Sequence, residues 1–297
     1  MNEKYQDSDG QRVIFEAIGK TGTKSDLQKL LAFNKENKIL NNAGFALAVY
    51  NFSLRKISDP KTLSALQRIL TQSEEGIGEI LFTLYRTGVT DSLTLSKVVN
   101  IVRTEIEKES PSQIIIQNAL GIFRKAKYFP NDIELLYRLS VSSDPIIRIE
   151  TSKTGIYFPF TVLTNLDFLF QLLFDNNPNV ARQMATSFRD IKLVENLKAD
   201  VIQFIRTHIK DKNLSEITRC ELFITFIKHI QTLDLNLIKE YEPFVDKGFI
   251  YQACGELSCL PEDIYDYLIN QYSEVRKEYK LLILASLLKH QKDFSGK

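Results

Sequence analysis

The residues that could do chemistry in this chain of 297 residues are few, and its three cysteines come first. Cys254 and Cys259 are separated by four residues, and Cys220 could supply a third thiolate. Structural zinc sites usually combine two tight pairs of cysteine or histidine ligands. This chain has one loose pair, and its three histidines are spread widely, so the pattern favours reduced, mostly buried thiols over a metal site. A cysteine–histidine nucleophile stays open, although no signature supports it.

A glycine- and lysine-rich segment at residues 19–25 has some likeness to a phosphate-binding loop. A true loop of that kind has glycine five residues before its Gly-Lys pair, where this chain has Ile14. The loop would also follow a β-strand, which the sequence does not predict here. Gly22 instead predicts the end of a helix, where glycine accepts a positive φ. We predict no catalytic residue, no cofactor and no metal.

The charge balance argues against nucleic acid as a partner. The chain has 38 Lys and Arg residues against 37 Asp and Glu residues, so its net charge of +1 gives no global attraction for phosphate. The basic run Arg206–Lys212 is interrupted by Asp211, which is more typical of a solvated helix end than of a nucleic-acid patch. The longest apolar run near the C-terminus, Leu281–Leu288, is far too short to span a membrane.

Aromatic and basic residues at regular intervals are the best candidates for a binding surface. The residues we select are Tyr85, Arg86, Arg124, Tyr128 and Tyr157, with further rings at Tyr50, Phe52, Phe129 and Phe158. Aromatic and arginine side chains are enriched in the hot spots of protein interfaces. If the elements that carry them stack in layers, these side chains form a row along one groove. The alternative is that the rings simply pack between layers.

Helices must position this row, because apolar residues recur at helical spacing throughout the chain. Six prolines fall where helices are expected to begin, a position at which their missing N–H costs nothing. They are Pro60, Pro111, Pro130, Pro145, Pro178 and Pro261. We expect Leu163–Phe174 to be the most buried helix. Small residues at Ala43, Ala46 and Ala48 should let a neighbouring helix come close.

Two segments in the middle of the chain have the same pattern. Asp144-Pro145 is followed by Arg148, and Asn177-Pro178 is followed by Arg182. The Asp-Pro and Asn-Pro steps are 33 residues apart and the arginines 34, which is the period of a helical-hairpin repeat. Such repeats form a solenoid, in which each layer contacts only its neighbours.

At these two segments, and more weakly at residues 215–219, the chain resembles a HEAT-repeat protein. The resemblance implies an all-α fold, a right-handed α-solenoid of about eight stacked helix pairs forming a single unit over residues 1–297. It also implies a ladder in which the arginine of one layer meets the acidic residue of the next. The ladder positions here are Asp144, Arg148, Arg182 and Arg219. Asn177 stands where the family usually has aspartate.

The first segment, residues 11–20, resembles the HEAT-repeat region that accompanies cyclophilin-type prolyl isomerase domains in some bacterial cell-envelope proteins. A helix of the kind expected second in a repeat starts within about a dozen residues of Met1, so we expect the chain to be a truncated piece of a longer protein. It would then be periplasmic or attached to the envelope. The N-terminal residues as given do not form a signal peptide, which indicates the cytoplasm.

The expected function is therefore a non-enzymatic scaffold that binds a protein or peptide along its concave face. Two alternatives stay open. The chain could be the accessory region of a prolyl isomerase or folding factor of the cell envelope. It could also resemble the HEAT-like DNA glycosylases, although its neutral charge and lack of tryptophan argue against a damaged base as the ligand.

Overall fold

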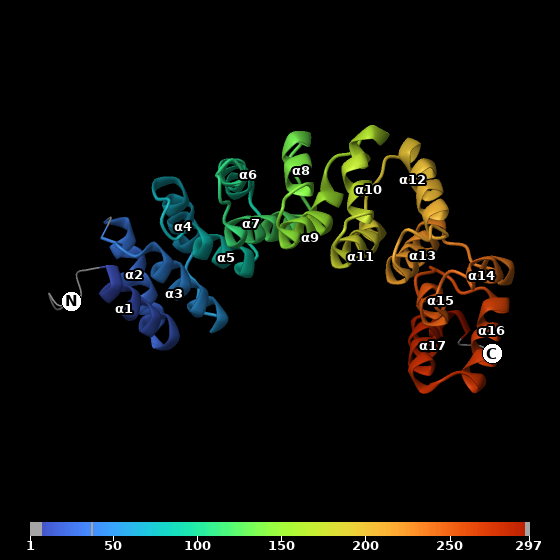
Figure 1. Ribbon diagram of the computed structural model, residues 1–297. Helices are drawn as coiled ribbons and strands as arrows, with labels where there is room; N and C mark the ends of the chain where they lie inside the picture. Colours follow the sequence, from blue (N-terminus) through green and yellow to red (C-terminus); the bar gives the residue numbers. More distant parts are fainter. Residues whose placement is uncertain (1–7, 37, 295–297) are drawn as a thin grey trace. The chain divides into compact units, whose positions relative to one another are not determined.

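The computed structural model describes residues 8–36 and 38–294, which form seventeen α-helices and no β-strand (Figure 1). Helix accounts for 73% of the described residues, so the prediction of an all-α protein with stacked neighbouring helices is confirmed. The chain divides into two compact units, Met1–Leu139 and Ser140–Lys297. The handedness of the stack, the number of repeats and the extent of a single solenoid stay predictions.

The first unit consists of two rows of helices that alternate along the chain (Figure 1). The odd-numbered helices pack closely, each on the next, and the even-numbered helices form a second, more loosely packed row. The helices are α1 (Ser8–Thr21), α2 (Lys24–Lys35), α3 (Asn42–Leu54), α4 (Lys61–Gln72), α5 (Ile77–Thr87), α6 (Ser92–Ile106) and α7 (Gln113–Ala126), followed by α8 (Ile133–Ser140) at the boundary.

The second unit repeats this arrangement, with each odd-numbered helix from α9 to α17 packed on the next. Its α-helices are α9 (Pro145–Thr154), α10 (Asp167–Leu173), α11 (Pro178–Ser187), α12 (Glu195–His208), α13 (Glu216–Ile230), α14 (Leu235–Tyr241), α15 (Lys247–Cys254), α16 (Glu262–Glu274) and α17 (Lys277–Lys289). Short 3-10 turns also occur, at η2 (Gly155–Tyr157), η3 (Leu163–Leu166), η4 (Phe188–Asp190) and η5 (Gln291–Phe294).

The helix starts at the repeated motif are as predicted. Pro145 and Pro178 occupy the first turns of α9 and α11. The side chain of Asp144 accepts a hydrogen bond from the N–H of Ile146 at 2.8 Å, and Asn177 accepts one from Asn179 at 3.0 Å. These contacts satisfy N–H groups that would otherwise have no partner in the first turn.

The starts assigned to Pro111 and Pro130 are wrong by two or three residues. Helix α7 begins at Gln113 and is capped by Ser112. Helix α8 begins at Ile133, and Asp132 accepts a hydrogen bond from the N–H of Leu135 at 3.0 Å. In both cases a polar side chain accepts a hydrogen bond from the N–H three residues later and so caps the helix. The proline lies in the loop that precedes this cap.

Two further expectations need correction. Leu163–Phe174 is not one buried helix, because η3 precedes the short α10 and the side chain of Phe174 is 45% exposed. Helix α13 has more buried residues than α10. Gly22 follows the end of α1 without a positive φ, since the described glycines with positive φ are Gly76 and Gly88.

Side-chain donors bridge the odd-numbered helices. The hydroxyl of Thr83 on α5 donates to the carbonyl of Ala46 on α3 at 3.0 Å, and Thr225 on α13 donates to Ala185 on α11 at 2.8 Å. Ser286 on α17 donates in the same way to Tyr251 on α15 at 2.5 Å. These hydroxyls are buried, so each bond gives a partner to polar groups that are cut off from water.

Two histidines extend this bridging one turn further along the same helices. Nε2 of His229 lies 2.7 Å from the carbonyl oxygen of Phe188, and Nε2 of His290 lies 3.2 Å from that of Cys254. A carbonyl accepts only from a protonated nitrogen, so each ring carries its proton on Nε2. Burial lowers the pKa of His229, because the charged imidazolium loses hydration there.

The alanine-rich face of α3 does allow close packing, as predicted. A Cβ atom added to Gly19 on α1 would lie 2.7 Å from the Cα of Ala48. Gly19→Ala should therefore lower the free energy of unfolding by about 1–3 kcal/mol through overpacking. The matched control is Gly78→Ala on α5, where the nearest atom is 3.5 Å away. This control should raise the free energy of unfolding by about 0.5–1 kcal/mol, because alanine is a better helix former than glycine. Urea denaturation measures both variants. Equal effects of the two substitutions would contradict the close packing of α1 on α3.

A second prediction concerns pH. Because the pKa of His229 is lowered in the folded chain, the unfolded chain binds more protons just below pH 6.5. The free energy of unfolding should therefore fall as the pH drops from 7.5 to 5.5. His229→Gln, whose amide can still donate to Phe188, should reduce this slope. Urea midpoints across the range measure it, and an unchanged slope in the variant would contradict the role of His229.

Candidate protein-binding surface

The arginine ladder was expected from the resemblance to HEAT repeats, and its first arginine binds an acidic residue of the next layer. Arg148 on α9 donates from Nε and Nη2 to the two carboxylate oxygens of Asp175, at 2.6 and 2.9 Å. Its Nη1 also donates to the carbonyl of Ser142 at 2.6 Å. Burial opposes ionisation of Asp175, but the hydrogen bonds from Arg148 and Asn177 outweigh it and lower its pKa. Asp144 caps α9 and is not the partner of this arginine.

The second arginine of the ladder, Arg182, has a glutamate as its acidic partner. Arg182 on α11 lies 3.3 Å from Oε1 of Glu221 on α13, and Arg189 binds the other oxygen of the same carboxylate. The side chain of Asn177, at the place of the expected aspartate, caps its own helix. Arg219 donates to the carbonyl of Leu214 at 2.7 Å, and its buried Nε has no hydrogen-bond partner among the described residues. Arg148 and Arg182 thus connect layers of the second unit, whereas Asp144 and Arg219, which the ladder was expected to include, bond within their own segments.

The aromatic and basic residues of the first unit gather at the C-terminal ends of three neighbouring odd-numbered helices. We call this set the aromatic–cation rim; it consists of Tyr50 on α3, Phe82, Tyr85 and Arg86 on α5, and Arg124 and Lys125 on α7. The rings of Tyr50 and Phe82 meet edge to face, with centroids 5.1 Å apart. The close packing of α3, α5 and α7 is what brings these residues together.

Each ring of α5 in the rim carries a cation. The guanidinium of Arg86 lies 5.5 Å from the centroid of Phe82, and the ammonium of Lys125 lies 5.0 Å from that of Tyr85. Arg124 donates from Nη2 to the hydroxyl of Tyr85 at 3.2 Å. Such cation–π contacts fix the rings and leave the charged groups at the surface.

Gly121 on α7 sets the position of Tyr85. A Cβ atom added there would lie 2.9 Å from the ring, so the Tyr85 side chain lies flat against the helix backbone. The ring is half-buried, whereas Arg86 and Lys125 are exposed. Neither Arg86 nor Lys125 forms an ion pair with a carboxylate in the part of the chain that the structure describes. Both are therefore available to an anionic partner.

The other selected aromatic residues have different surroundings. Tyr128 is half-buried and packs edge-on against Phe123, with centroids 5.7 Å apart. Tyr157 is half-buried in η2 of the second unit. The remaining rings pack inside, since Phe52, Phe129 and Phe158 are all buried. Sequence reasoning missed Phe82 and Lys125, although Phe82 lies one helical turn before Arg86 and so shares its face.

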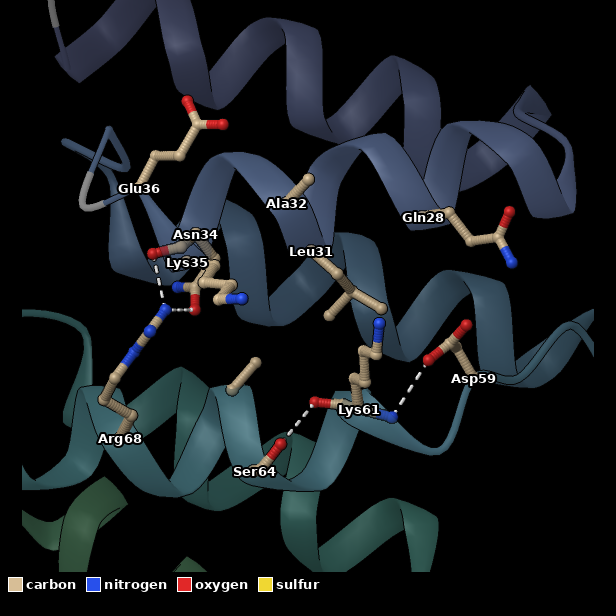
Figure 2. A pocket seen from close by; sticks show the side chains of 11 residues that line it. Gln28, Leu31, Ala32, Asn34, Lys35, Glu36, Asp59, Lys61, Ser64 and Arg68 are labelled. Carbon is tan, nitrogen blue, oxygen red and sulfur yellow. Dashed lines mark hydrogen bonds between the residues drawn. The ribbon is translucent and has the colours of Figure 1, made fainter.

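A groove also opens between the even-numbered helices α2 and α4 (Figure 2). It has a volume of about 770 Å³, with Leu31, Ala32 and Ala65 among its lining residues. Figure 2 shows Arg68 bridging it to the side chain and carbonyl of Asn34. A similar groove of about 520 Å³ lies between α4 and α6. Because it recurs in the next layer, we interpret the groove as a consequence of wide helix spacing and not as a dedicated site.

The other segments that could do chemistry have structural surroundings. Burial raises the pKa of Cys220 to about 11 and that of Cys254 to about 12, so both thiols stay protonated. Cys259 is exposed. Within the described residues, no three His, Cys, Asp or Glu side chains are grouped as metal ligands would be. From the basic run, Lys210 and Arg206 both bind Glu240, at 2.7 and 3.6 Å.

Comparison with protein-family models, with curated proteins and with solved structures finds no match to this chain. Among the described helices, none has the length and apolar character needed to cross a membrane.

The ladder leads to a prediction on stability. Arg148 and Asp175 are both largely buried, so Arg148→Met would leave a carboxylate without its partner and lower the free energy of unfolding by about 3–5 kcal/mol. The matched control is Arg138→Met, which breaks an exposed pair with Glu134 and should cost less than about 1 kcal/mol. Urea denaturation measures both, and similar losses would show that the Arg148 pair does not hold the layers together.

Proposed function

We propose that this chain is a non-enzymatic, HEAT-like scaffold that holds a segment of another protein along the ends of its odd-numbered helices. The aromatic–cation rim of the first unit is the observation that supports the proposal. Its rings and cations come from three successive layers, and a bound segment would contact all three at once.

The chemistry of the rim indicates what such a segment contains. Half-buried rings at Tyr50, Phe82 and Tyr85 suit apolar side chains, and the exposed cations of Arg86 and Lys125 suit carboxylates. We therefore expect an acidic segment with interspersed apolar residues. Cations at helix C-termini also interact favourably with the helix dipole and so stabilise the helix. The experiment must therefore separate an effect on binding from an effect on folding stability.

The test uses the full chain with a photo-crosslinking amino acid at one of two rim positions, Tyr50 or Lys125, in cells of its source. Mass spectrometry of the crosslinked peptides should identify the same acidic segment from both positions. The matched control is the same amino acid at Leu93 on α6, which is 55% exposed but lies outside the rim. It should not crosslink to that segment.

A double substitution completes the test. Arg86→Ala with Lys125→Ala should reduce the affinity for the identified segment, prepared as a peptide, at least tenfold. The urea midpoint should fall only slightly, because each exposed cation contributes less than about 1 kcal/mol to stability. Equal crosslinking from position 93, or unchanged affinity in the double variant, would overturn the proposal.

A further inference from the structure

The three helices that carry the rim end in the same way. Helices α3, α5 and α7 each run into a residue with positive φ, which is Lys56 at 59°, Gly88 at 77° and Lys127 at 49°. The N–H of the next residue donates to the carbonyl five residues before it, from Ile57 to Phe52, Val89 to Leu84 and Tyr128 to Phe123, at 3.0, 3.1 and 3.0 Å. A Schellman turn therefore closes three successive layers, and equivalent positions can be counted back from it.

Counting back two residues from each turn gives one exposed row across the layers. It consists of Leu54, Arg86 and Lys125, and we call it the end row. The side chain of Leu54 is 62% exposed and lies one helical turn after Tyr50, so the two share a face of α3. From α3 to α7, the end row is thus apolar, cationic and cationic.

Two further cations lie just beyond this row, at the outer turns. A residue with a side chain is disfavoured at positive φ, whereas glycine adopts it freely, as Gly88 does in the middle layer. Lys56 and Lys127, which we call the turn lysines, are exposed, and neither pairs with a carboxylate among the residues that the structure describes. The outer turns therefore keep a charge where glycine would be more stable, which indicates a role outside folding.

The carboxylates that follow these helix ends do not neutralise the cations. Asp59, Asp91 and Asp132 each accept a hydrogen bond from an N–H at the start of the next even-numbered helix, at 2.9, 3.0 and 3.0 Å. Glu79 lies two turns before Arg86, toward the opposite end of α5. The charge left open along the end row is therefore positive.

The spacing of the layers selects the conformation of a bound segment. Helices that pack directly on each other have axes about 8–10 Å apart, so the end row repeats at about this distance. A polyproline II segment has three residues per turn and rises about 9.3 Å per turn, so every third side chain meets the row. Side chains on one face recur about every 6.6 Å in a β-strand and about every 5.4 Å in an α-helix, and neither repeat matches.

We propose that the end row binds a segment in the polyproline II conformation. A large apolar residue of this segment contacts Leu54 and Tyr50. Carboxylates three and six residues away from it bind Arg86 and Lys125, and the turn lysines attract further acidic residues at the two ends. This inference rests on the proposed function and adds to it the conformation of the segment, the spacing of its contacts and the layer that takes its apolar residue.

The test screens the full chain against a displayed library of randomised 16-residue peptides. Binders are kept if they lose affinity for the variant Arg86→Ala with Lys125→Ala. Among them, a large apolar residue with Asp or Glu three and six residues away, in either chain direction, should be enriched. Replacing the intervening residues by proline should leave the affinity unchanged or raise it, because proline favours polyproline II and breaks helices.

Lys56→Gly with Lys127→Gly separates binding from folding. Glycine suits a positive φ, so the urea midpoint should rise, while the affinity for the selected peptides should fall about tenfold because two cations are lost. The matched control, Lys56→Arg with Lys127→Arg, keeps both charges and should keep the affinity. Leu54→Ser should also weaken binding, whereas Leu93→Ser, which changes a leucine of similar exposure on α6, should not.

The results distinguish this inference from the proposed function. If no selected peptide depends on Arg86 and Lys125, both are overturned. The selected peptides could instead depend on these cations but favour acidic residues at four and seven, lose affinity on proline replacement, or bind the double glycine variant as tightly. Any of these three results would overturn the polyproline II geometry and leave the proposed function standing.

Discussion

The close contact between successive odd-numbered helices is the constraint on which each unit depends. An α-helix can approach another this closely only where side chains are small or where they satisfy the backbone they meet. Gly19 against Ala48 meets the first condition, and Thr83 against Ala46 meets the second. The two conditions also occur together, because Ser286 bridges α17 to α15 at a point where a Cβ atom added to Gly255 would lie 3.1 Å from its hydroxyl oxygen.

This constraint also explains why the rim and the ladder lie where they do. Close packing of α3, α5 and α7 brings their C-terminal ends together, so side chains that end one helix meet those that end the next. In the second unit the same spacing lets Arg148 reach Asp175 and lets Glu221 bind two arginines. The rim and the stabilising network thus arise from one spacing.

The sequence predicted features that depend on residues close together along the chain. It missed features that depend on which helix faces pack against each other. Helix caps at Asp144 and Asn177 follow from a few adjacent residues, and so do the all-α class and the stacking of neighbours. The pairing of Arg189 with Glu221 spans 32 residues, and that of Thr83 with Ala46 spans 37, so neither leaves a local signal. Phe82 was missed for the same reason, because its role depends on Tyr50 from another helix.

The two rows of the first unit differ in how their helices are joined. The odd-numbered row is joined by buried hydrogen bonds and close backbone contacts, whereas grooves of about 770 and 520 Å³ separate neighbouring even-numbered helices. Hydrogen bonds nevertheless cross these grooves, from Arg68 to Asn34 and from Lys97 to the carbonyl of Gln67. The spacing within the even-numbered row therefore depends on the reach of long polar side chains, whereas the spacing within the odd-numbered row depends on backbone contact.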